Sequence, residues 1–362
     1  MPPVTMRVIA DEVGFSKNTV SLALRDDPSI SAETRELIKK TADRLGYRPN
    51  AVVSQLIAQL RAGRTARFQA KLALINAHRD PKAFRTHATI PAYVQGCGRR
   101  GLQLGYTFDP FWLHDPKQKA ESLIRILRTR GIKGIIIVGL MDQNQLPPQL
   151  QPVWEEFPCV VTGVRTREPA LSFSCVDHHD LVIQAFERAL ALGYQRPALV
   201  VEEKIDRLVE GRFSGAMLTA QQNLPATRRV PAFMEVQQPG TDGGPFRKWF
   251  ERHQPDVLLS LYNIVFPWLK AAGCRVPQDV GVIQLEWRAN HPEIAGMNQH
   301  NDAVGEAAVD MIVGQIHRNE SGIPEFPRAT LIGASWVEGS SVRPMAPSAP
   351  AARGRSGAAP VP

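Results

Sequence analysis

Apolar residues recur at helical spacing near the start of the chain. A first run from Val8 to Val13 follows Thr5, whose hydroxyl can cap a helix by accepting a backbone N–H. Gly14 tolerates the left-handed backbone that ends a helix, and Phe15 behind it is expected in the core. The pattern therefore predicts a first helix that ends at Gly14.

Two further helices are predicted before residue 47. Ser16 is a suitable cap for a helix from Lys17 to about Arg25, and Ser31 for a third helix that ends at Gly46. The residues of the third helix that we expect to be buried are Leu37, Ile38, Ala42 and Leu45. A helix, a short turn with glycine and a second helix form the helix-turn-helix pattern, whose second helix reads base edges. A small helical bundle without a nucleic-acid role is the alternative.

Residues 49–64 continue a helical pattern after Pro49, which is tolerated at a helix start. The apolar positions of this segment are Val52, Val53, Leu56, Ile57 and Leu60. A lone helix of this length is marginal in water, and we expect this segment to be a link between two parts of the chain.

From about Lys71 the pattern changes to short apolar runs that alternate with amphipathic ones. Predicted strands are Leu72–Asn76, Gly105–Phe108, Gly134–Val138, Cys159–Thr162, Ser172–Val176, Ala198–Val201, Val230–Met234, Val257–Leu261 and Val280–Leu285. Predicted helices are Ala92–Leu104, Lys119–Arg130, Asn144–Phe157, Leu181–Leu192, Gly211–Asn223, Phe246–His253 and Ile264–Ala272. This alternation predicts two Rossmann-like α/β lobes with parallel sheets and a cleft between them, in which ligands bind beyond the carboxyl ends of strands. A last helix, Asp302–Arg318, and a strand, Ala329–Val337, are expected to cross back between the lobes.

The net charge of +8 is concentrated at the two ends of the chain. Residues 1–67 hold +4 and residues 341–362 hold +3, which leaves +1 for the rest of the 362 residues. A basic N-terminal region is the electrostatic signature of contacts to nucleic-acid phosphates. The tail, 341–362, is rich in Ala, Pro and Gly, and we expect it to be disordered.

The cysteines and histidines indicate neither a disulfide framework nor a metal site. The four cysteines are widely spaced and form no CxxC pair, which fits a reducing cytoplasm. His178 and His179 are adjacent on a predicted helix, so their side chains point about 100° apart. No apolar run is long enough for a membrane span, and the N-terminus lacks a secretory signal. We therefore expect a cytoplasmic protein without a metal.

Sequence motifs of the common enzyme classes are missing as well. The chain contains no GxSxG, no HExxH, no GxxxxGK[ST] and no dinucleotide fingerprint after a strand. The prediction is therefore a protein that is not an enzyme and that uses no cofactor.

Two stretches, VIADEVGFSKNTVSLAL and SAETRELIKKTADRLGYRPN, resemble the lactose/galactose-repressor (LacI/GalR) family of bacterial transcription regulators. The likeness continues more weakly through GRFSGAMLTAQQ and PDVLLSLYN, and covers roughly residues 4 to 343. It implies a dimeric repressor with a helix-turn-helix head, a hinge helix and a periplasmic-binding-protein-like core. The implied domains are the head at 1–48, the hinge at 49–64, the core at 65–340 and the tail at 341–362. Within the core, lobe one takes about 69–164 plus 296–326, and lobe two about 168–294 plus 327–340.

The predicted DNA contacts lie in the head and the hinge. Lys17 and Asn18 begin the second helix, where lysine can donate to guanine and asparagine can pair with adenine. Leu22 lies one turn further on and can touch a thymine methyl group. An alternative for Lys17 is a phosphate contact, which carries no sequence information. Predicted phosphate contacts are Thr19, Ser21 and Thr34. Further predicted DNA contacts, without an assigned phosphate or base, are Thr5, Ser16 and Asn50.

The resemblance also implies a role for a leucine of the hinge. In the family, a hinge helix folds against its dimer partner on DNA, and a leucine wedges into the minor groove. By register from the head that residue is Leu56, with Leu60 one turn later as the rival. Packing within the linker is the alternative role for Leu56.

Candidate ligand residues follow the strand ends. They are Asn76, His78, Trp112, Asp177, Arg212, Asn263 and Glu286. The resemblance supports Arg212 most directly, since its planar fork can bind hydroxyls or a carboxylate. The chain departs from the family at Tyr262–Asn263, where an Asn-Asp pair is common, and at Gln284–Leu285, which precede Glu286 in place of Gly-Tyr. These departures put a plain hexose effector in question.

The expected function is a homodimeric, ligand-responsive repressor on a near-palindromic DNA operator. The effector is expected to be a sugar or a related metabolite. Whether it releases DNA or promotes binding is left open by these residues. The alternative from another class is a constitutive DNA-binding dimer whose core has lost its ligand.

Overall fold

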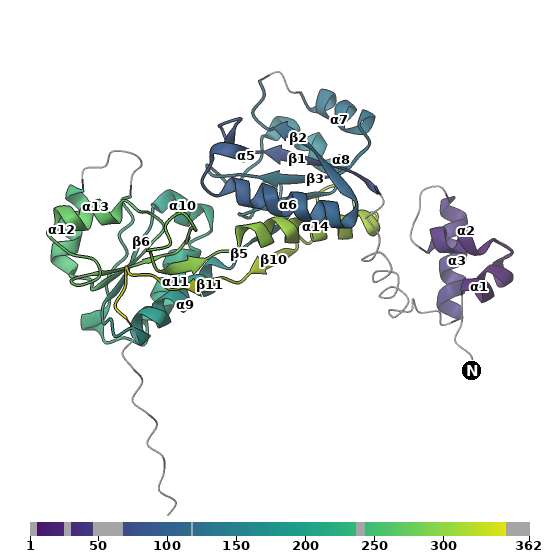
Figure 1. Ribbon diagram of the computed structural model, residues 1–362. Coiled ribbons are helices and arrows are strands. Elements are labelled where there is room, and N and C mark those ends of the chain that lie inside the picture. Colours follow the sequence, from purple (N-terminus) through teal and green to yellow (C-terminus); the bar gives the residue numbers. More distant parts are fainter. Residues whose placement is uncertain (1–5, 25–29, 46–67, 117–118, 237–242, 345–362) are drawn as a thin grey trace, which may run out of the picture. The chain divides into compact units, whose positions relative to one another are not determined.

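The computed structural model describes residues 6–24, 30–45, 68–116, 119–236 and 243–344 (Figure 1). The chain divides into two compact units, Met1–Asp177 with His300–Gly333, and His178–Gln299 with Ala334–Pro362. Within the first unit we call residues 6–45 the head, and residues 68–177 with 300–333 lobe one. Lobe two is residues 178–299 with 334–344.

The head consists of α1 (Met6–Val13), α2 (Lys17–Ala23) and α3 (Ala32–Arg44). Its buried core is formed by Ile9, Ala10, Val20, Ala23, Ile38 and Ala42. Arg44, at the end of α3, forms an ion pair of 2.8 Å with Glu12 of α1. The predicted helices and the caps Ser16 and Ser31 are confirmed, although α2 ends at Ala23, before the predicted Arg25.

Three apolar residues of the head are exposed, and two of them, Phe15 and Leu37, were expected inside. Val8 and Leu37 are 45% and 50% exposed, while their neighbours Ile9 and Ile38 are buried. Adjacent helical side chains point about 100° apart, so only one of each pair faces the core. Phe15, 39% exposed, lies beyond the left-handed Gly14 that ends α1, where the chain has turned away.

Lobe one is built on a six-stranded parallel sheet with the strand order β10-β5-β4-β3-β1-β2. Its strands are β1 (Ala70–Asn76), β2 (Tyr106–Trp112), β3 (Ile132–Val138), β4 (Cys159–Thr162), β5 (Ser172–Val176) and β10 (Ala329–Ile332). Its helices are α5 (Ala83–Thr86), α6 (Ile90–Leu104), α7 (Ala120–Thr129), η1 (Pro148–Leu150), α8 (Gln151–Glu156) and α14 (Asn301–His317). In Figure 1, α6 and α14 lie side by side on one face of the sheet, and α7 and α8 lie on the other.

Helices α6 and α14 approach each other through glycine. A Cβ built on Gly96 would lie 1.9 Å from the carbonyl oxygen of Asp302, and one on Gly305 would lie 2.2 Å from that of Tyr93. The Sγ of Cys97 donates to the carbonyl oxygen of Gly305 at 3.3 Å. Burial raises the pKa of this thiol to about 12, so the thiol keeps its proton.

Ion pairs line the outer edge of the same helix pair. Arg99 donates to Asp302 at 2.7 Å and to Glu306 at 2.6 Å, and Arg100 donates to Asp310 at 2.7 Å. Burial acts to raise the pKa of Asp302, but hydrogen bonds from Arg99 and the backbone, together with the Arg99 charge, hold it below the usual value. These exposed pairs add little stability individually.

Lobe two has a five-stranded sheet with the order β11-β9-β8-β7-β6, in which only the pair β11 and β9 is antiparallel. Its strands are β6 (Pro197–Val200), β7 (Val257–Ser260), β8 (Gly281–Gln284), β9 (Gly296–Asn298) and β11 (Ser335–Val337). Its helices are α9 (His178–Ala191), α10 (Glu203–Leu208), α11 (Arg212–Gln221), η2 (Ala226–Arg228), α12 (Gly244–His253) and α13 (Val265–Ala271). Helices α9 and α11 pack against each other, and α9 also contacts β6 and β7.

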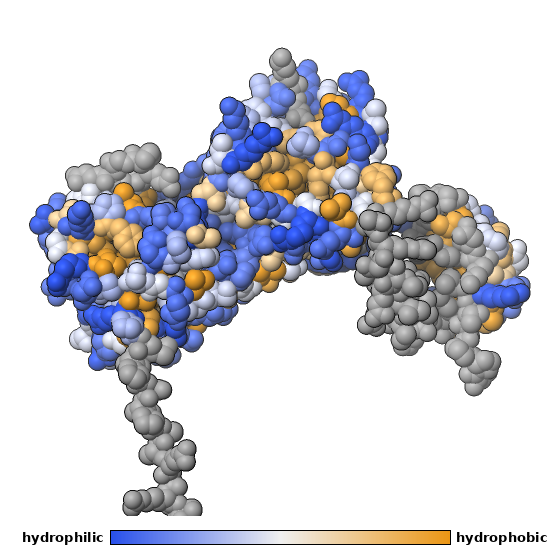
Figure 2. Space-filling view, viewed as in Figure 1, coloured by the Kyte–Doolittle hydropathy of each residue, from blue (hydrophilic) through white to orange (hydrophobic). Residues whose placement is uncertain are grey.

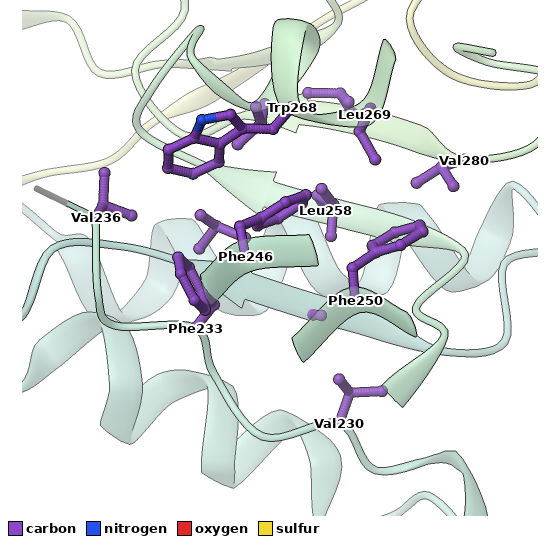
Figure 3. Close-up of a cluster of buried hydrophobic side chains, with 13 residues drawn as sticks. Val230, Phe233, Val236, Phe246, Phe250, Leu258, Trp268, Leu269 and Val280 are labelled. Carbon is purple, nitrogen blue, oxygen red and sulfur yellow. The ribbon is translucent and has the colours of Figure 1, made fainter. Parts of the chain in front are cut away.

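The core beside α12 and α13 is rich in aromatic rings (Figure 3). Phe233 and Trp268 pack around Phe246 with centroid distances of 5.5 and 5.0 Å, and Phe250 stacks on it at 5.7 Å. Since aromatic side chains bury large areas, this cluster anchors both helices to the sheet.

Three predictions about strands are wrong. The strand Ala329–Val337 is two strands, β10 in the first sheet and β11 in the second. Ser172–Val176, expected in lobe two, pairs with β4 and β10 in lobe one. Val230–Met234 forms no strand, because Pro231 supplies no backbone N–H and only Phe233 bonds to β6.

No helix in the described parts of the chain is long and apolar enough to cross a membrane. Figure 2 shows hydrophilic residues over much of the visible face of both lobes, with smaller apolar patches between them. Single exposed apolar residues such as Leu102 and Leu218 are normal on a protein surface.

We predict that Gly96→Ala destabilises lobe one by about 1–3 kcal/mol or more, because its methyl group meets backbone that cannot move aside. Gly98→Ala, two residues along the same helix, is the control. Nothing lies within 4 Å of its Cβ, so it should be neutral or stabilising by up to about 1 kcal/mol. Urea unfolding monitored by circular dichroism measures both, and equal midpoints for the two variants would rule out the close approach.

Candidate functional site

The N-terminal ends of α2 and α3 in the head are capped in the same way. The Oγ of Ser16 accepts from the backbone N–H of Thr19 at 3.0 Å, and the two hydroxyl oxygens are 2.8 Å apart. The Oγ of Ser31 accepts from the backbone N–H of Thr34 at 3.2 Å and donates to its Oγ1 at 2.8 Å. Both predicted phosphate-binding threonines therefore face the cap serine of their own helix.

The remaining predicted DNA contacts are only partly within the description. Leu22 is half-buried on α2. Lys17, Asn18 and Ser21 belong to α2, but their side chains lie outside the described part of the structure. Thr5, Asn50, Leu56 and the rival Leu60 also lie outside the described residues. Their DNA-binding roles stay predictions.

In lobe one, Asn76 ends β1 and is 2% exposed. Its Nδ2 donates to the carbonyl oxygens of Asp80 and Pro81 at 3.0 and 3.2 Å. Its Oδ1 accepts from the backbone N–H of His78 at 3.0 Å. The amide of Asn76 is therefore occupied with holding the segment after β1.

Trp112 is the last residue of β2 and not, as expected, a residue of the loop after it. Strand β2 runs past the predicted Phe108 because it is the edge strand, where Pro110 costs no hydrogen bond on the open side. The indole Nε1 of Trp112 donates to the carbonyl oxygen of His78 at 3.0 Å. The structure thus brings these two predicted ligand residues together.

Two histidines that the sequence analysis missed join them. The ring of His87 lies 5.2 Å from that of His78, and the ring of His114 lies 6.4 Å from that of Trp112. His114 donates from Nε2 to the carbonyl oxygen of Ala77 at 2.9 Å. His114 follows a strand end and could have been found by the rule that found Trp112, whereas His87 lies eleven residues beyond β1.

Lobe two positions Arg212 at the first turn of α11. Its guanidinium lies 3.7 Å from the carboxylate of Glu210, and the two side chains are only 20% and 17% exposed. Glu210 and Gly211 both have left-handed backbone, with φ of 61° and 73°. This sharp turn delivers Arg212 to the start of the helix.

Asp206 fixes that turn. It is 5% exposed, and its Oδ1 accepts from the backbone N–H groups of Phe213 and Ser214 at 3.1 and 3.0 Å. Its Oδ2 accepts from the hydroxyl of Ser214 at 2.6 Å. The sequence analysis missed this cap because it lies six residues before the helix, beyond the reach of local capping rules.

The ends of β6, β7 and β8 gather acids around a tyrosine. The backbone N–H of Glu202 donates to the Tyr262 hydroxyl at 3.4 Å, and Arg288 donates to Glu286 at 2.9 Å. Burial raises the pKa of Tyr262 far above its usual value, and the charges of Glu202 and Glu286 act in the same direction. The phenol therefore keeps its proton at the carboxyl ends of these strands. Asn263, next along the chain, is exposed.

Asp177 and the histidines after it occupy different surroundings. Asp177 is half-buried at the end of β5, and its backbone N–H donates to the carbonyl oxygen of Ile332 at 2.9 Å. His178 is buried with its ring 4.9 Å from that of Phe213, while His179 is exposed. No group of three or more potential ligands among the described residues is arranged to hold a metal ion.

Comparisons with known proteins agree with this geometry. Residues 5–50 match the family described as "Bacterial regulatory proteins, lacI family", and residues 186–342 match the "Periplasmic binding protein-like domain". The HTH-type transcriptional regulator PtxS of Pseudomonas putida is 25% identical over 336 residues, which cover 88% of this chain and 91% of that protein.

Two solved structures share the fold. The complex of the transcriptional regulator CelR with cellobiose has a TM-score of 0.55 at 20% identity, and the alignment covers 93% of this chain and 99% of that one. The lac repressor dimer bound to operator and the anti-inducer ONPF has a TM-score of 0.54 at 20% identity, covering 94% and 99%. These likenesses establish the fold alone.

We predict that Asp206→Ala destabilises lobe two by about 1–3 kcal/mol, because two buried backbone N–H groups and a hydroxyl lose their acceptor. Glu203→Ala, on the same helix, removes only an exposed ion pair with Arg207 and should cost about 0.5 kcal/mol or less. Urea denaturation of both variants tests this. If Asp206→Ala were no less stable than Glu203→Ala, the capping role of Asp206 would be wrong.

Proposed function

Because this chain belongs to the lacI family of bacterial transcriptional regulators, we propose that it is a homodimeric repressor whose hold on its operator is controlled by a small molecule. The match of residues 5–50 to the DNA-binding region of that family, over three helices with the expected caps, is the observation that carries the proposal. The protein acts in the cytoplasm, on double-stranded DNA, and has no catalytic activity of its own.

Charge and symmetry determine how the heads bind. Residues 1–67 carry +4, so phosphate contacts supply much of the affinity and make it fall steeply with salt. Two heads related by two-fold symmetry select two half-sites of a near-palindromic operator. Within each half-site, Lys17, Asn18 and Leu22 of α2 read the bases, and Leu56 of the hinge wedges into the minor groove between them.

The polar residues at the strand ends of lobe two favour an uncharged, hydroxyl-rich ligand. Arg212 has Glu210 as an ionic partner, and Arg288 has Glu286. Each guanidinium is already neutralised, so a carboxylate or phosphate on the ligand would have to displace a glutamate from it. A neutral sugar or related polyol can instead donate to the glutamates and accept from the arginines. The cellobiose bound to CelR is a ligand of this class.

In lobe one, His78 and Trp112 offer aromatic rings to a ligand of the same class. Both are half-buried, and their rings belong to a group of aromatic side chains at the ends of β1 and β2. Aromatic faces bind the apolar face of a sugar ring, with the polar groups around them fixing its orientation. Asp177, at the end of β5, supplies a further acceptor.

A constitutive DNA-binding dimer is the second candidate. The occupied amide of Asn76 favours it, since a predicted ligand group is engaged by its own loop. So does the pair Tyr262–Asn263, which departs from the Asn-Asp pair that is common in the family.

Selection of bound DNA from a random pool tests the regulator, using the full-length protein and Asn18→Ala in parallel. The wild type should enrich a near-palindromic motif. Asn18→Ala should lose preference for one base in each half-site, by about 1–3 kcal/mol of discrimination. Thr19→Val is the control, because the loss of a phosphate contact lowers affinity without altering the motif. Sequence-indifferent binding by the wild type would overturn the specific repressor.

A panel of small molecules tests the ligand class. A neutral oligosaccharide or polyol that binds, present at a concentration of about a hundred times its dissociation constant, should add roughly 2.7 kcal/mol to the stability of the protein. Sugar acids and sugar phosphates of matched shape are the control, and they should leave the melting temperature unchanged. Stabilisation by the acidic compounds alone would contradict the charge argument, and no stabilisation by any compound would favour the constitutive dimer.

A further inference from the structure

The segment after β1 is held by side chains that each accept a hydrogen bond from the backbone two residues later. The Oδ1 of Asn76 accepts from the N–H of His78 at 3.0 Å, and the Nδ1 of His78 accepts from the N–H of Asp80 at 3.0 Å. The Oδ1 of Asp80 in turn accepts from the N–H of Lys82 at 2.8 Å. Three successive turns are therefore closed by side-chain acceptors, and the middle acceptor is an imidazole.

A second imidazole closes the other end of the segment. The Nδ1 of His87 accepts from the backbone N–H of Thr89 at 3.0 Å and from that of Ile90 at 3.3 Å. Ile90 is the first residue of α6, so this ring holds the start of the helix. The rings of His78 and His87 are 5.2 Å apart and tilted by 58°.

These contacts assign the protonation state of both rings. A backbone N–H can only donate, so each Nδ1 must present a lone pair and carry no proton. An imidazolium has N–H on both ring nitrogens, so it has no lone pair and would oppose the same backbone donors. Two adjacent charged rings would also repel each other. The observed segment thus requires both histidines to be neutral.

We propose that residues 77–90 form a proton-sensitive lock, closed when His78 and His87 are neutral and released when they take up protons. The closed form binds fewer protons than the open form, so it is favoured at high pH and lost as the pH falls. Histidine is the side chain whose charge most often changes between pH 5 and 8, so this is the range in which the lock is tested.

The charged groups around His78 support release and do not prevent it. The Asp80 carboxylate accepts from Lys82 and from the hydroxyl of Thr86, both at 2.8 Å, and these two bonds lower its pKa. Asp80 therefore stays ionised and provides an anionic partner for a protonated His78 that has turned away from the backbone.

Two other neighbouring groups, Arg79 and His114, do not favour either the closed or the released form of the lock. Arg79 is paired with Asp142 at 3.4 Å on the surface, so its charge is compensated. His114 donates from Nε2 to the carbonyl oxygen of Ala77, so its backbone contact does not need an unprotonated nitrogen, unlike those of His78 and His87.

The consequence for the ligand rests on the proposed function. His78 is a proposed ligand residue within the lock, and Asn76, another one, accepts from its backbone N–H, so ligand affinity should fall when the lock is released. The lock itself requires no ligand and can be tested without one, which keeps the two proposals separable.

Hydrogen exchange of the full-length protein, read by mass spectrometry and corrected for the chemical exchange rate at each pH, is the test. Protection of peptides within residues 77–90 should fall between pH 7.5 and 5.5, with a limiting slope of about tenfold per pH unit for each proton taken up on release. Peptides from β3 should stay protected throughout and so report that lobe one remains folded.

The double variant His78→Asn and His87→Asn separates the lock from other effects. The Oδ1 of asparagine takes the place of Nδ1 and accepts the same backbone N–H, but it does not titrate. Protection in this variant should be independent of pH. His291→Asn in lobe two is the matched control, since His291 faces Glu293 at 3.2 Å and not a backbone donor. It should keep the wild-type response.

Two outcomes would overturn the lock. One is wild-type protection of residues 77–90 that stays constant from pH 7.5 to 5.5. The other is a loss in the double asparagine variant as large as that of the wild type. If the double variant does not fold, the single variant His87→Asn takes its place. Its protection should depend on pH less steeply than that of the wild type, by the slope that belongs to one proton, about tenfold per pH unit.

Discussion

The contact between α6 and α14 holds lobe one together, because it joins two helices that lie some two hundred residues apart in the chain. Gly96 and Gly305 let the two backbones meet, and the buried hydroxyl of Ser174 donates to the carbonyl oxygen of Val304 at 2.9 Å. With α14 fixed in this way, β10 follows it to the edge of the sheet and pairs with β5. The sheet of lobe one is therefore completed by the last part of the chain.

At the strand ends of both lobes, some polar residues hold the backbone of a turn, and others are carried by that turn and remain accessible to a ligand. Asp206 organises the turn from which Arg212 extends, and Asn76 organises the segment that contains His78. Both organisers are almost completely buried, whereas the residues that they position are partly accessible. A buried polar group must be fully satisfied, so it suits a structural role better than the recognition of a ligand that comes and goes.

Local patterns predicted most helices and the central strands, because hydrophobic periodicity and capping act over a few residues. The caps Ser16 and Ser31 were predicted for this reason, and the structure has both. Non-local pairing was not predictable in the same way. The assignment of Ser172–Val176 to lobe one depends on partners far away in the sequence, and so does the division of Ala329–Val337 between two sheets. His87 was missed because its importance comes from the backbone that it accepts, which no residue pattern reveals.

The placement of the tryptophans gives the molecule a built-in optical reporter. Of the two tryptophans in lobe one, Trp154 is completely buried, whereas Trp112 is partly accessible at the end of β2. An aqueous quencher can therefore reach Trp112 and not Trp154. The indole N–H of Trp112 donates to the carbonyl oxygen of His78, so a change at that strand end alters the surroundings of this fluorophore. The head contains no tryptophan, and the fluorescence of the intact chain is therefore silent about DNA-facing residues and informative about the core.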